Sequence, residues 1–244
     1  MDNKTASQLL SLNHKFYQTF AQDFSETRQR LQPGVLKVLE EVPRGVSILD
    51  LGCGNGELAR VLAERDFPCS YTGVDFSSNL MAEAREDLPP NFQGEFYPLD
   101  LTLPDWEDRL PDRKFDLIFA FAVYHHLPGR RLRRQVSENV HRRLRQEGTF
   151  YLSNWQFLKS ERLARRIQPW SAAGIEPDRV EEDDYLLDWR RGGLGLRYVH
   201  YFTAQELEAL AAETGFQVES TFFSDGKSDN LSIYQAWKPV SGPR

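Results

Sequence analysis

A glycine-rich stretch, S-I-L-D-L-G-C-G-N-G-E-L-A at residues 47–59, constrains the fold of this chain more than any other segment. Its apolar beginning suits a buried strand, and the residues from Glu57 onward suit a helix. Between them, Gly52, Gly54 and Gly56 give a turn with almost no side chains. The stretch therefore predicts a strand, a tight turn and a helix, with a ligand lying directly against the backbone of the turn.

An acidic residue follows this turn at the spacing typical of a nucleoside site. Residues 71–75 predict a second strand that ends in Asp75. In a doubly wound sheet, a carboxylate at this place accepts hydrogen bonds from two ribose hydroxyls. The glycine spacing is G-x-G-x-G instead of the dinucleotide fingerprint G-x-G-x-x-G, which argues against nicotinamide binding. The turn and the acid together predict an adenosine-containing ligand.

Two further strand ends carry polar side chains. Residues 94–99 predict a third strand, which leads into Asp100 and Leu101. The Asp100 carboxylate either accepts a hydrogen bond from an adenine amino group or caps the turn that follows. The strongly apolar segment 114–122 predicts a central parallel strand, and it leads into His125 and His126. Ligands collect at the carboxyl ends of such strands. Each histidine is therefore either a candidate general base or a structural hydrogen-bonding residue.

The segments on either side of these strands leave alternatives open. Residues 1–42 predict helices with an aromatic stripe beginning at Phe16, and these helices either pack on the core or form a lid over the ligand. Residues 155–202 interrupt the alternation of strands and helices. They form either a substrate-side insertion above the pocket or a surface excursion with a small core of its own. We expect both flanks to belong to one domain, 1–244.

Charge is distributed unevenly along the chain, whose formal net charge is -6. Residues 130–145 hold seven arginines and one glutamate, whereas residues 176–188 hold seven acidic residues and one arginine. The arginine-rich segment predicts a helix whose basic faces are either solvated or in contact with phosphates. Further along, Thr203 and Glu206 predict a capping box at the start of another helix, and two strands then end the sheet.

Composition excludes several classes of protein. With 244 residues, 40% of them hydrophobic, the chain can bury one substantial core. Its two cysteines, Cys53 and Cys69, give no disulfide framework, and no ligand spacing predicts a metal site. The amino terminus lacks the pattern of a secretory signal, and no apolar run approaches the roughly 18 residues of a membrane span. We therefore expect a cytoplasmic protein without a membrane partner.

The order of these parts resembles that of the class I S-adenosylmethionine-dependent methyltransferases. The resemblance rests on D-L-G-C-G-N-G, G-V-D-F-S, L-D-L-T and F-A-V-Y-H-H-L within residues 45–154. It implies an α/β fold with a doubly wound, mostly parallel seven-stranded sheet and an antiparallel terminal strand, the Rossmann-like methyltransferase fold. The implied cofactor is S-adenosylmethionine, with S-adenosylhomocysteine as the product. The cofactor-binding residues implied in this way are Tyr17, Arg28, Asp50, Gly52, Gly54, Gly56, Asp75, Phe76, Asp100, Leu101, Phe121 and His126.

The flanks more narrowly resemble the wobble-uridine tRNA carboxyl methyltransferases. The similar segments are F-Y-Q-T-F-A-Q-D-F-S-E-T-R at 16–28, Q-P-W at 168–170, R-Y-V-H-Y-F at 197–202 and S-D-N at 228–230. This resemblance implies a carboxymethyl group on uridine as the methyl acceptor, with tRNA and a small activator subunit as partners. It implies catalytic roles for Arg197, His200 and Arg28, and substrate contacts for Tyr198, Trp170 and Asn230.

Three functions remain as hypotheses. The first is methyl transfer to a carboxylate on a modified wobble uridine of tRNA. A carboxylate is already an adequate nucleophile, so such an enzyme mainly positions the reactants and excludes water. Arg197 is the first candidate to orient the carboxylate, and Arg28 is the second. The second hypothesis is methylation of a small-molecule carboxylate, hydroxyl or amine, and the third is a cofactor- or RNA-binding partner without turnover.

Overall fold

The computed structural model describes residues 1–20, 23, 30–86, 88–90 and 92–240. Its main sheet has seven strands in the order β3-β2-β1-β4-β5-β10-β9. Strand β10 pairs antiparallel with both β5 and β9, and the pairs from β3 to β5 are parallel. The predicted fold class is therefore confirmed. The strands are β1 (Val46–Leu51), β2 (Cys69–Asp75), β3 (Gly94–Pro98), β4 (Phe115–Phe121), β5 (Leu144–Trp155), β9 (Phe216–Ser224) and β10 (Ser232–Pro239).

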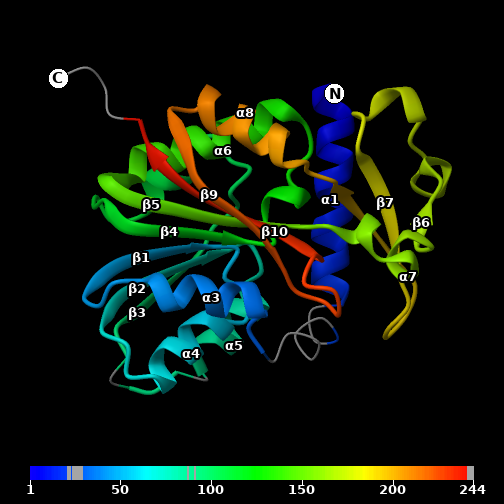
Figure 1. Ribbon diagram of the computed structural model, residues 1–244. Helices are drawn as coiled ribbons and strands as arrows, with labels where there is room; N and C mark the ends of the chain where they lie inside the picture. The colour runs from blue at the N-terminus through cyan, green and yellow to red at the C-terminus, as the bar shows by residue number, and fades with distance from the viewer. Residues whose placement is uncertain (21–22, 24–29, 87, 91, 241–244) are drawn as a thin grey trace.

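Helices cover both faces of this sheet (Figure 1). On one face lie α3 (Pro33–Glu41), α4 (Glu57–Glu64) and α5 (Ser78–Glu86), and on the other lie α6 (Arg130–Arg143) and α8 (Ala204–Glu213). The central strand β4 reads F-D-L-I-F-A-F and is almost entirely buried, because it has helices above and below it. The continuous apolar run in the sequence is a direct result of this layering.

The apolar core is divided by the sheet into two clusters. One contains Phe150 and Trp237 with residues of α6 and α8, and the other contains Ile48 and Phe119 with residues of α3, α4 and α5. In the described ranges, no helix is both long enough and apolar enough to cross a bilayer. The two apolar clusters hold the main sheet between the helix layers, and the carboxyl ends of its parallel strands lie at one edge.

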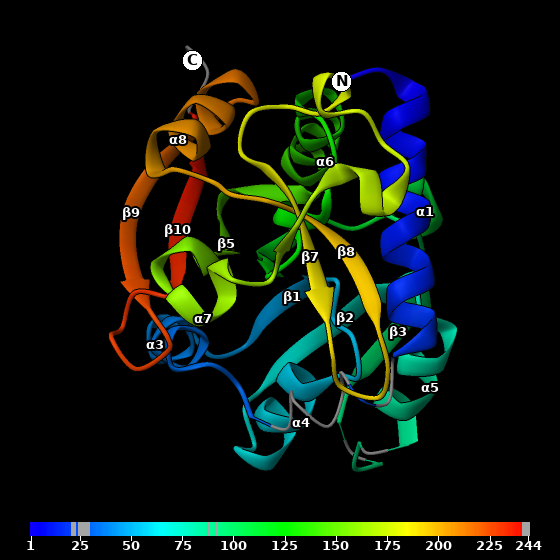
Figure 2. The ribbon, with the colours of Figure 1, turned by 90° about the vertical axis from the view of Figure 1, so that its right-hand side faces the viewer.

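Helix α1 (Asn3–Thr19) and a small second sheet stand at that edge (Figures 1 and 2). The second sheet has the order β6-β7-β8, with β6 (Ile167–Gln168), β7 (Asp184–Trp189) and β8 (Gly195–His200). The Asn13 amide of α1 donates to the carbonyl of Tyr198 at 3.1 Å and accepts from its backbone N–H at 2.8 Å. Because of these two bonds, α1 lies fixed along β8.

Short helices connect the larger elements. They are α7 (Glu161–Ala164) and the 3-10 turns η1 (Trp106–Arg109), η2 (Tyr124–His126), η3 (Phe157–Lys159), η4 (Trp170–Ala173) and η5 (Pro177–Arg179). Around η3 and the small sheet, Phe157, Leu163, Leu187 and Val199 form a separate apolar cluster. The segment between β5 and α8 therefore has a small core of its own, as one of the two alternatives for it required.

One of the two hydrogen bonds of the predicted capping box at the start of α8 is present. Thr203 caps α8 and accepts from the backbone N–H of Glu206 at 3.1 Å. The Glu206 carboxylate, however, lies 2.9 Å from Nε2 of His200. The second half of the expected capping box is replaced by a contact that ties α8 to β8.

The arginine-rich helix α6 differs from a simple solvated helix. Arg133 is buried and pairs with Glu181 at 2.7 Å, although the pattern predicted arginines on the outer faces. Most other arginines of the segment also have acidic partners, which lowers the positive charge available to a polyanion. These pairs are Arg130 with Glu213, Arg134 with Glu138, Arg142 with Glu107, Arg143 with Asp108 and Asp112, and Arg145 with Asp116.

Candidate functional site

A cavity of about 390 Å³ lies where β1, β2 and β4 end, beside α1. Volumes of this order are typical of small-molecule sites. The fold thus brings together residues that the sequence analysis singled out in distant segments. Those lining the cavity are Tyr17, Asp50, Gly52, Gly54, Asp75, Phe76, Asp100, Leu101, Phe121, His126 and Arg197.

The glycine turn forms part of the cavity wall with its backbone. Gly52 has φ +70°, and a Cβ on it would lie 2.6 Å from Cγ2 of Val123. Gly54 has φ +56°, and a Cβ on it would meet nothing within 4 Å. A side chain at Gly54 would therefore project into open space beside the turn, and its absence leaves room for a ligand against the backbone.

Gly56 has a different role from the one expected. It does not line the cavity but precedes the first turn of α4 with φ +77°. A Cβ on Gly56 would lie 2.7 Å from Cβ of Ala84 in α5. The missing side chain allows α4 and α5 to pack closely, and the cofactor contact expected of Gly56 stays a prediction.

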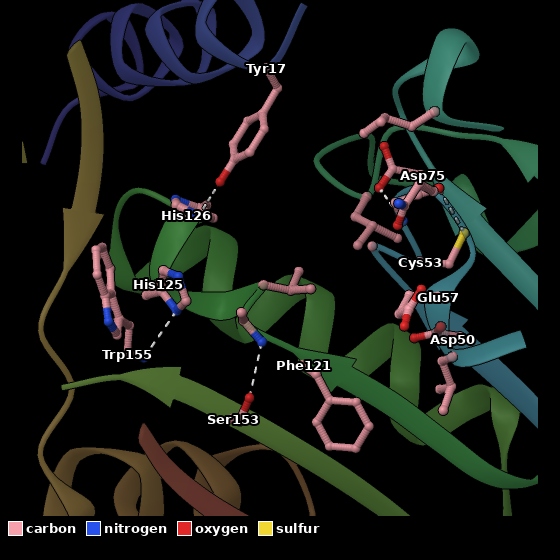
Figure 3. A pocket seen from close by; sticks show the side chains of 18 of the residues that line it. Tyr17, Asp50, Cys53, Glu57, Asp75, Phe121, His125, His126, Ser153 and Trp155 are labelled. Atoms are coloured by element: carbon pink, nitrogen blue, oxygen red, sulfur yellow. Dashed lines mark hydrogen bonds between the residues drawn. The ribbon is translucent and has the colours of Figure 1, made fainter. Parts of the chain in front are cut away.

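Carboxylates line one side of the cavity, where Figure 3 shows Asp50, Glu57 and Asp75. Asp75 accepts from the backbone N–H of Gly54 at 3.0 Å and from that of Ser77 at 2.8 Å. Burial raises the pKa of Asp75, and these backbone donors oppose the rise. Burial also raises the pKa of Asp50 to about 7. This wall suits a ligand that carries hydroxyl donors and positive charge.

Tyr17 and His126 meet on the other side of the cavity (Figure 3). The hydroxyl of Tyr17 is 2.7 Å from Nε2 of His126, and Nδ1 of His126 is 3.2 Å from the carbonyl oxygen of Tyr198. Nδ1 of His126 is also 3.5 Å from the amide nitrogen of Asn13, so both ring nitrogens of His126 face hydrogen-bonding groups of the protein. Nδ1 of His125 accepts from the backbone N–H of Trp155 at 3.3 Å. These bonds favour the structural alternative for both histidines.

His14 lines the adenosine end predicted for the cavity, although the sequence analysis did not identify it. Its ring stacks on Phe76 with 4.4 Å between centroids, and its Nε2 lies 3.7 Å from Oδ2 of Asp100. The spacing of His14 and Tyr17, three residues apart on one helix, contained the signal that places both on the same face. Helix α1 therefore contributes two rings to this wall.

Arg197 approaches the cavity inside a box of aromatic rings. The guanidinium carbon lies 4.8 Å from the ring centroid of Trp155, 5.4 Å from that of Phe16 and 5.7 Å from that of Trp189. The residue is only 6% exposed. Trp155 stands on the side of the cavity away from Asp50 and Asp75 (Figure 3). The cation is therefore separated from the acidic wall by the cavity itself.

Two predicted residues of β8 lie outside the cavity. Tyr198 is fully buried and donates its hydroxyl hydrogen bond to Asp184 at 2.7 Å. His200 is bonded through Nδ1 to Asp184 at 2.7 Å and through Nε2 to Glu206. Successive side chains of a strand point to opposite faces, so Tyr198 cannot share the face of Arg197. The structure therefore does not bring Tyr198 and His200 to the cavity, and the substrate contact of Tyr198 and the catalytic role of His200 stay predictions.

The remaining predicted residues are also outside the cavity lining. Trp170 packs beside the cluster of Leu9, Ile175 and Tyr198 at the far end of α1. Asn230 precedes Leu231, which lines the cavity, but Asn230 itself does not. Arg28 lies outside the described residues. The structure does not place Trp170 and Asn230 at the cavity, and the expectations for Trp170, Asn230 and Arg28 stay predictions.

Asp225 is a cavity residue that the sequence analysis missed. It lies in the turn between β9 and β10, accepts from the backbone N–H of Gly34 at 2.9 Å and accepts from the hydroxyl of Tyr234 at 2.7 Å. Its segment, S-D-G-K-S-D-N, reads as an ordinary polar turn. Nothing local to the sequence indicates that this turn closes on α3.

One described cluster has spacing that a metal ion could use, namely Glu181, Asp184 and His200. Its groups are already engaged by Arg133, Tyr198 and Glu206. Internal hydrogen bonds and ion pairs account for the cluster, and we assign no metal to it.

The residues lining the cavity fit a cationic nucleoside. Backbone without side chains lies at the glycine turn, carboxylates stand where ribose and ammonium groups need acceptors, and Phe76 and Leu101 supply apolar surface for a base. S-adenosylmethionine has each of these parts. The donor set and the open space at Gly54 therefore agree with the cofactor that the sequence implied.

Comparison with known proteins identifies the same family. The methyltransferase domain family matches residues 23–221. A protein of Encephalitozoon cuniculi named as a methyltransferase is 32% identical over 207 residues, which cover 84% of this chain and 87% of that protein. The tRNA (carboxymethyluridine(34)-5-O)-methyltransferase of Saccharomyces cerevisiae is 31% identical over 63% of this chain, but only 51% of the yeast protein is covered.

A similar fold is found in solved structures. A SAM-dependent methyltransferase from Methanosarcina mazei superposes with a TM-score of 0.63 at 20% identity, covering 86% of this chain and 99% of that one. The strand order, the cavity at the carboxyl ends and the family match agree with one another. The chain belongs to the class I S-adenosylmethionine-dependent methyltransferases.

Proposed function

We propose that this methyltransferase esterifies a carboxylate carried by a modified wobble uridine of tRNA. The observation that carries the proposal is the division of charge across the cavity. Asp50 and Asp75 line one side and Trp155 stands on the other (Figure 3). The Arg197 guanidinium lies against the Trp155 ring, with 4.8 Å between the guanidinium carbon and the ring centroid. A cationic cofactor suits the first side and an anionic acceptor suits the second.

Arg197 suits the task of orienting a carboxylate. Its planar fork can hold both oxygens at once, and the rings of Phe16, Trp155 and Trp189 fix the plane of that fork. When bound, S-adenosylmethionine supplies a methyl group on a sulfonium. The carboxylate oxygen forms the new bond to that methyl group, and the electron pair of the broken bond stays on sulfur. Positioning of this kind contributes about 7 to 11 kcal/mol to lowering such a barrier.

His125 and His126 are both hydrogen-bonded to other residues of the protein, which is consistent with methylation of a carboxylate. A carboxylate acceptor has already lost its proton, so the site needs no strong base. His126 and His125 instead fix Tyr17 and Trp155 around the cavity. Rings fixed in this way narrow the access of water to the acceptor side in the proposal, which matters because water competes for the polar groups that orient the carboxylate.

Similarity to the yeast enzyme supports tRNA as the carrier of the carboxylate. Separately, the family resemblance noted in the sequence includes R-Y-V-H-Y-F at 197–202, the segment that contains Arg197. A cavity of about 390 Å³ is far smaller than a tRNA, so such an acceptor inserts only its modified nucleobase. A small activator subunit belongs to this proposal as a partner of the chain.

Transfer of a tritiated methyl group to tRNA tests the proposal. We expect incorporation into tRNA that carries 5-carboxymethyluridine and none into the same tRNA with unmodified uridine. The assay is run with the chain alone and with the chain purified together with its partners from its own cells, because an activator subunit is expected. Absence of incorporation in both preparations, with cofactor binding intact, contradicts the proposal.

A small-molecule carboxylate is the second candidate acceptor. The ion pairs of Arg130, Arg134 and Arg142 favour it, because they reduce the positive charge that α6 offers to a polyanion. Labelling of a cell extract separates the two candidates. Label that enters material sensitive to ribonuclease supports tRNA, and label that enters small acids in an extract already treated with ribonuclease supports the second candidate.

A further inference from the structure

A buried tyrosine bonds one of the acidic groups of the cavity from within the sheet. The hydroxyl of Tyr71 in β2 donates to Oδ2 of Asp50 in β1 at 2.6 Å. Tyr71 is 1% exposed and Asp50 is 4% exposed. In the parallel pairing of the two strands, Tyr71 lies opposite Ile48, so its long side chain reaches forward two residues to the carboxylate. Tyr71 thus contacts Asp50 from the core, while Asp50 lines the cavity.

Packing fixes the position of the Tyr71 hydroxyl. The ring centroid of Tyr71 lies 5.7 Å from that of Phe96 and 6.0 Å from that of Phe92. The ring belongs to the cluster on the α3, α4 and α5 face of the sheet. A hydroxyl held in this way cannot follow Asp50 if the carboxylate turns, so the bond also fixes the carboxylate.

Several elements place polar and charged groups around Asp50, and of these Asp75 makes its negative charge costly. Strand β2 contributes Asp75 along with Tyr71, the glycine turn contributes Cys53, and α4 contributes Glu57, which Figure 3 shows beside Asp50. Helix α5 contributes the cation Arg85, which donates to the carbonyl of Phe96, and β4 places Phe119 opposite Asp50.

Burial is the main cause that raises the pKa of Asp50, and the charge of Asp75 adds to it. The hydrogen bond from Tyr71 acts in the opposite direction and lowers the pKa. Since the pKa of Asp50 is about 7, the carboxylate changes charge near neutral pH. The hydrogen bond from Tyr71 therefore keeps more of the protein with Asp50 ionised than burial and Asp75 alone would allow.

We propose that Tyr71 is a positioning residue for the cofactor, holding Asp50 as an oriented carboxylate that receives the cationic amino-acid end of S-adenosylmethionine. The bond occupies Oδ2 and assigns Oδ1 to the ligand. A cation binds the ionised form of Asp50, so cofactor binding below the pKa of Asp50 releases a proton. Apart from the titration of the ligand's own amino group, affinity accordingly rises with pH up to the pKa of Asp50 and is level above it. Without the Tyr71 hydroxyl, the pKa of Asp50 rises and the whole profile moves to higher pH.

This inference rests on the cofactor and not on the methyl acceptor. Its test therefore measures binding, and its failure is distinct from a failure of methyl transfer to tRNA. The dissociation constant of S-adenosylmethionine is measured by calorimetry from pH 6 to 9 for the wild type, Tyr71→Phe and Asp50→Asn. The ionisation of S-adenosylmethionine itself affects binding to all three proteins equally, so it cancels in the ratio of any two dissociation constants.

We expect Tyr71→Phe to bind about tenfold more weakly than the wild type at pH 7, since a hydrogen bond to a charged group is lost. The two proteins should agree within about threefold at pH 9, where Asp50 is ionised in both. Asp50→Asn should bind weakly at every pH and show no proton release in buffers of different ionisation enthalpy. A constant ratio between the wild type and Tyr71→Phe across the pH range overturns the proposal, because that result indicates only a structural role.

Tyr124→Phe is the matched control. Tyr124 is also a fully buried tyrosine, and its hydroxyl is 3.1 Å from the neutral hydroxyl of Ser137. Its loss should lower stability without moving the pH profile of binding. If Tyr71→Phe fails to fold, the role of an ionised Asp50 is tested by the ratio of wild-type to Asp50→Asn affinity. A ratio that does not change between pH 6 and 8 contradicts that role.

Discussion

The hydroxyl of Tyr17 lies 2.7 Å from Nε2 of His126, and this contact joins α1 to the turn that follows β4. The two rings meet edge to face with 5.4 Å between their centroids. Nδ1 of the same imidazole is 3.2 Å from the carbonyl oxygen of Tyr198 in β8. A single histidine side chain therefore connects the N-terminal helix, the main sheet and the small sheet beside the cavity.

Tyr17→Phe removes the hydroxyl and keeps the ring. That ring also packs edge to face on Phe76, with 6.2 Å between the ring centroids. A neutral hydrogen bond contributes about 0.5–1.5 kcal/mol, so we expect the dissociation constant of S-adenosylmethionine to rise about two- to tenfold. Calorimetry measures this change. Tyr185→Phe, which removes a hydroxyl from β7, serves as the control and should bind as the wild type does. Equal affinity of both variants would show that α1 does not close on the cofactor.

Asp75→Ala removes the carboxylate that we assign to the ribose. We expect affinity for S-adenosylmethionine to fall by about 1.5–3 kcal/mol, roughly 10- to 150-fold. Stability should fall too, because Asp75 accepts from the backbone of Gly54 and Ser77. Asp116→Ala is the matched control, since Asp116 accepts from the backbone N–H and hydroxyl of Ser47 away from the cavity. A folded Asp75→Ala with wild-type affinity would remove the ribose role.

Arg197→Lys keeps a positive charge but loses the planar fork that stacks against Trp155 and Phe16. We expect kcat for methyl transfer to fall at least about 100-fold, while the dissociation constant of the cofactor changes less than about threefold. Arg190→Lys, at an exposed position next to β7, should leave both quantities unchanged. Equal losses of turnover and cofactor affinity in Arg197→Lys would argue against a role in orienting the acceptor.

His200 predicts a pH dependence of folding stability. Burial opposes a charge on the imidazole, but hydrogen bonds to Asp184 and Glu206 outweigh it and raise the pKa of His200. The folded protein then holds the proton more tightly than the unfolded chain does. The stabilising contribution is complete below about pH 6.5 and is lost as the pH rises through the folded pKa.

Urea unfolding at several pH values tests this dependence. The free energy of unfolding should decrease from pH 6 to pH 8 in the wild type, with a smaller decrease in His200→Gln. His141→Gln changes a histidine whose ring packs on Phe216 at 5.0 Å and serves as the comparison. Parallel curves for the wild type and His200→Gln would contradict the assignment.

The cofactor side of the cavity was accessible to sequence reasoning. Asp50 and Asp75 lie at the carboxyl ends of β1 and β2, and Asp100 follows β3. These strands are parallel neighbours, so they present their carboxyl ends at a common edge. Glycine spacing and strand ends are local features of the sequence, so each could be identified from a few neighbouring residues.

The acceptor side was less accessible because it depends on tertiary packing. Asp225 reaches the cavity only because the turn after β9 closes on Gly34. His200 was assigned to the substrate from a motif, whereas the structure places it against Asp184 and Glu206. The motif alone does not reveal which face of β8 is turned to the cavity. Arg197, Tyr198 and His200 were therefore all expected at the substrate, although Arg197 lies on one face of β8 and the other two lie on the opposite face.

Strand β10 lies between β5 and β9 in the sheet, although it follows both of them in the chain. During synthesis, the six other strands leave the ribosome before residues 232–239 do. Until then β5 has an unpaired edge, and the cavity lacks Ser232 and Tyr234. The cavity wall is therefore complete only when the last strand of the sheet is in place. A chain that stops earlier exposes an open strand edge of the kind that promotes aggregation and recruits chaperones, and insertion of β10 removes it.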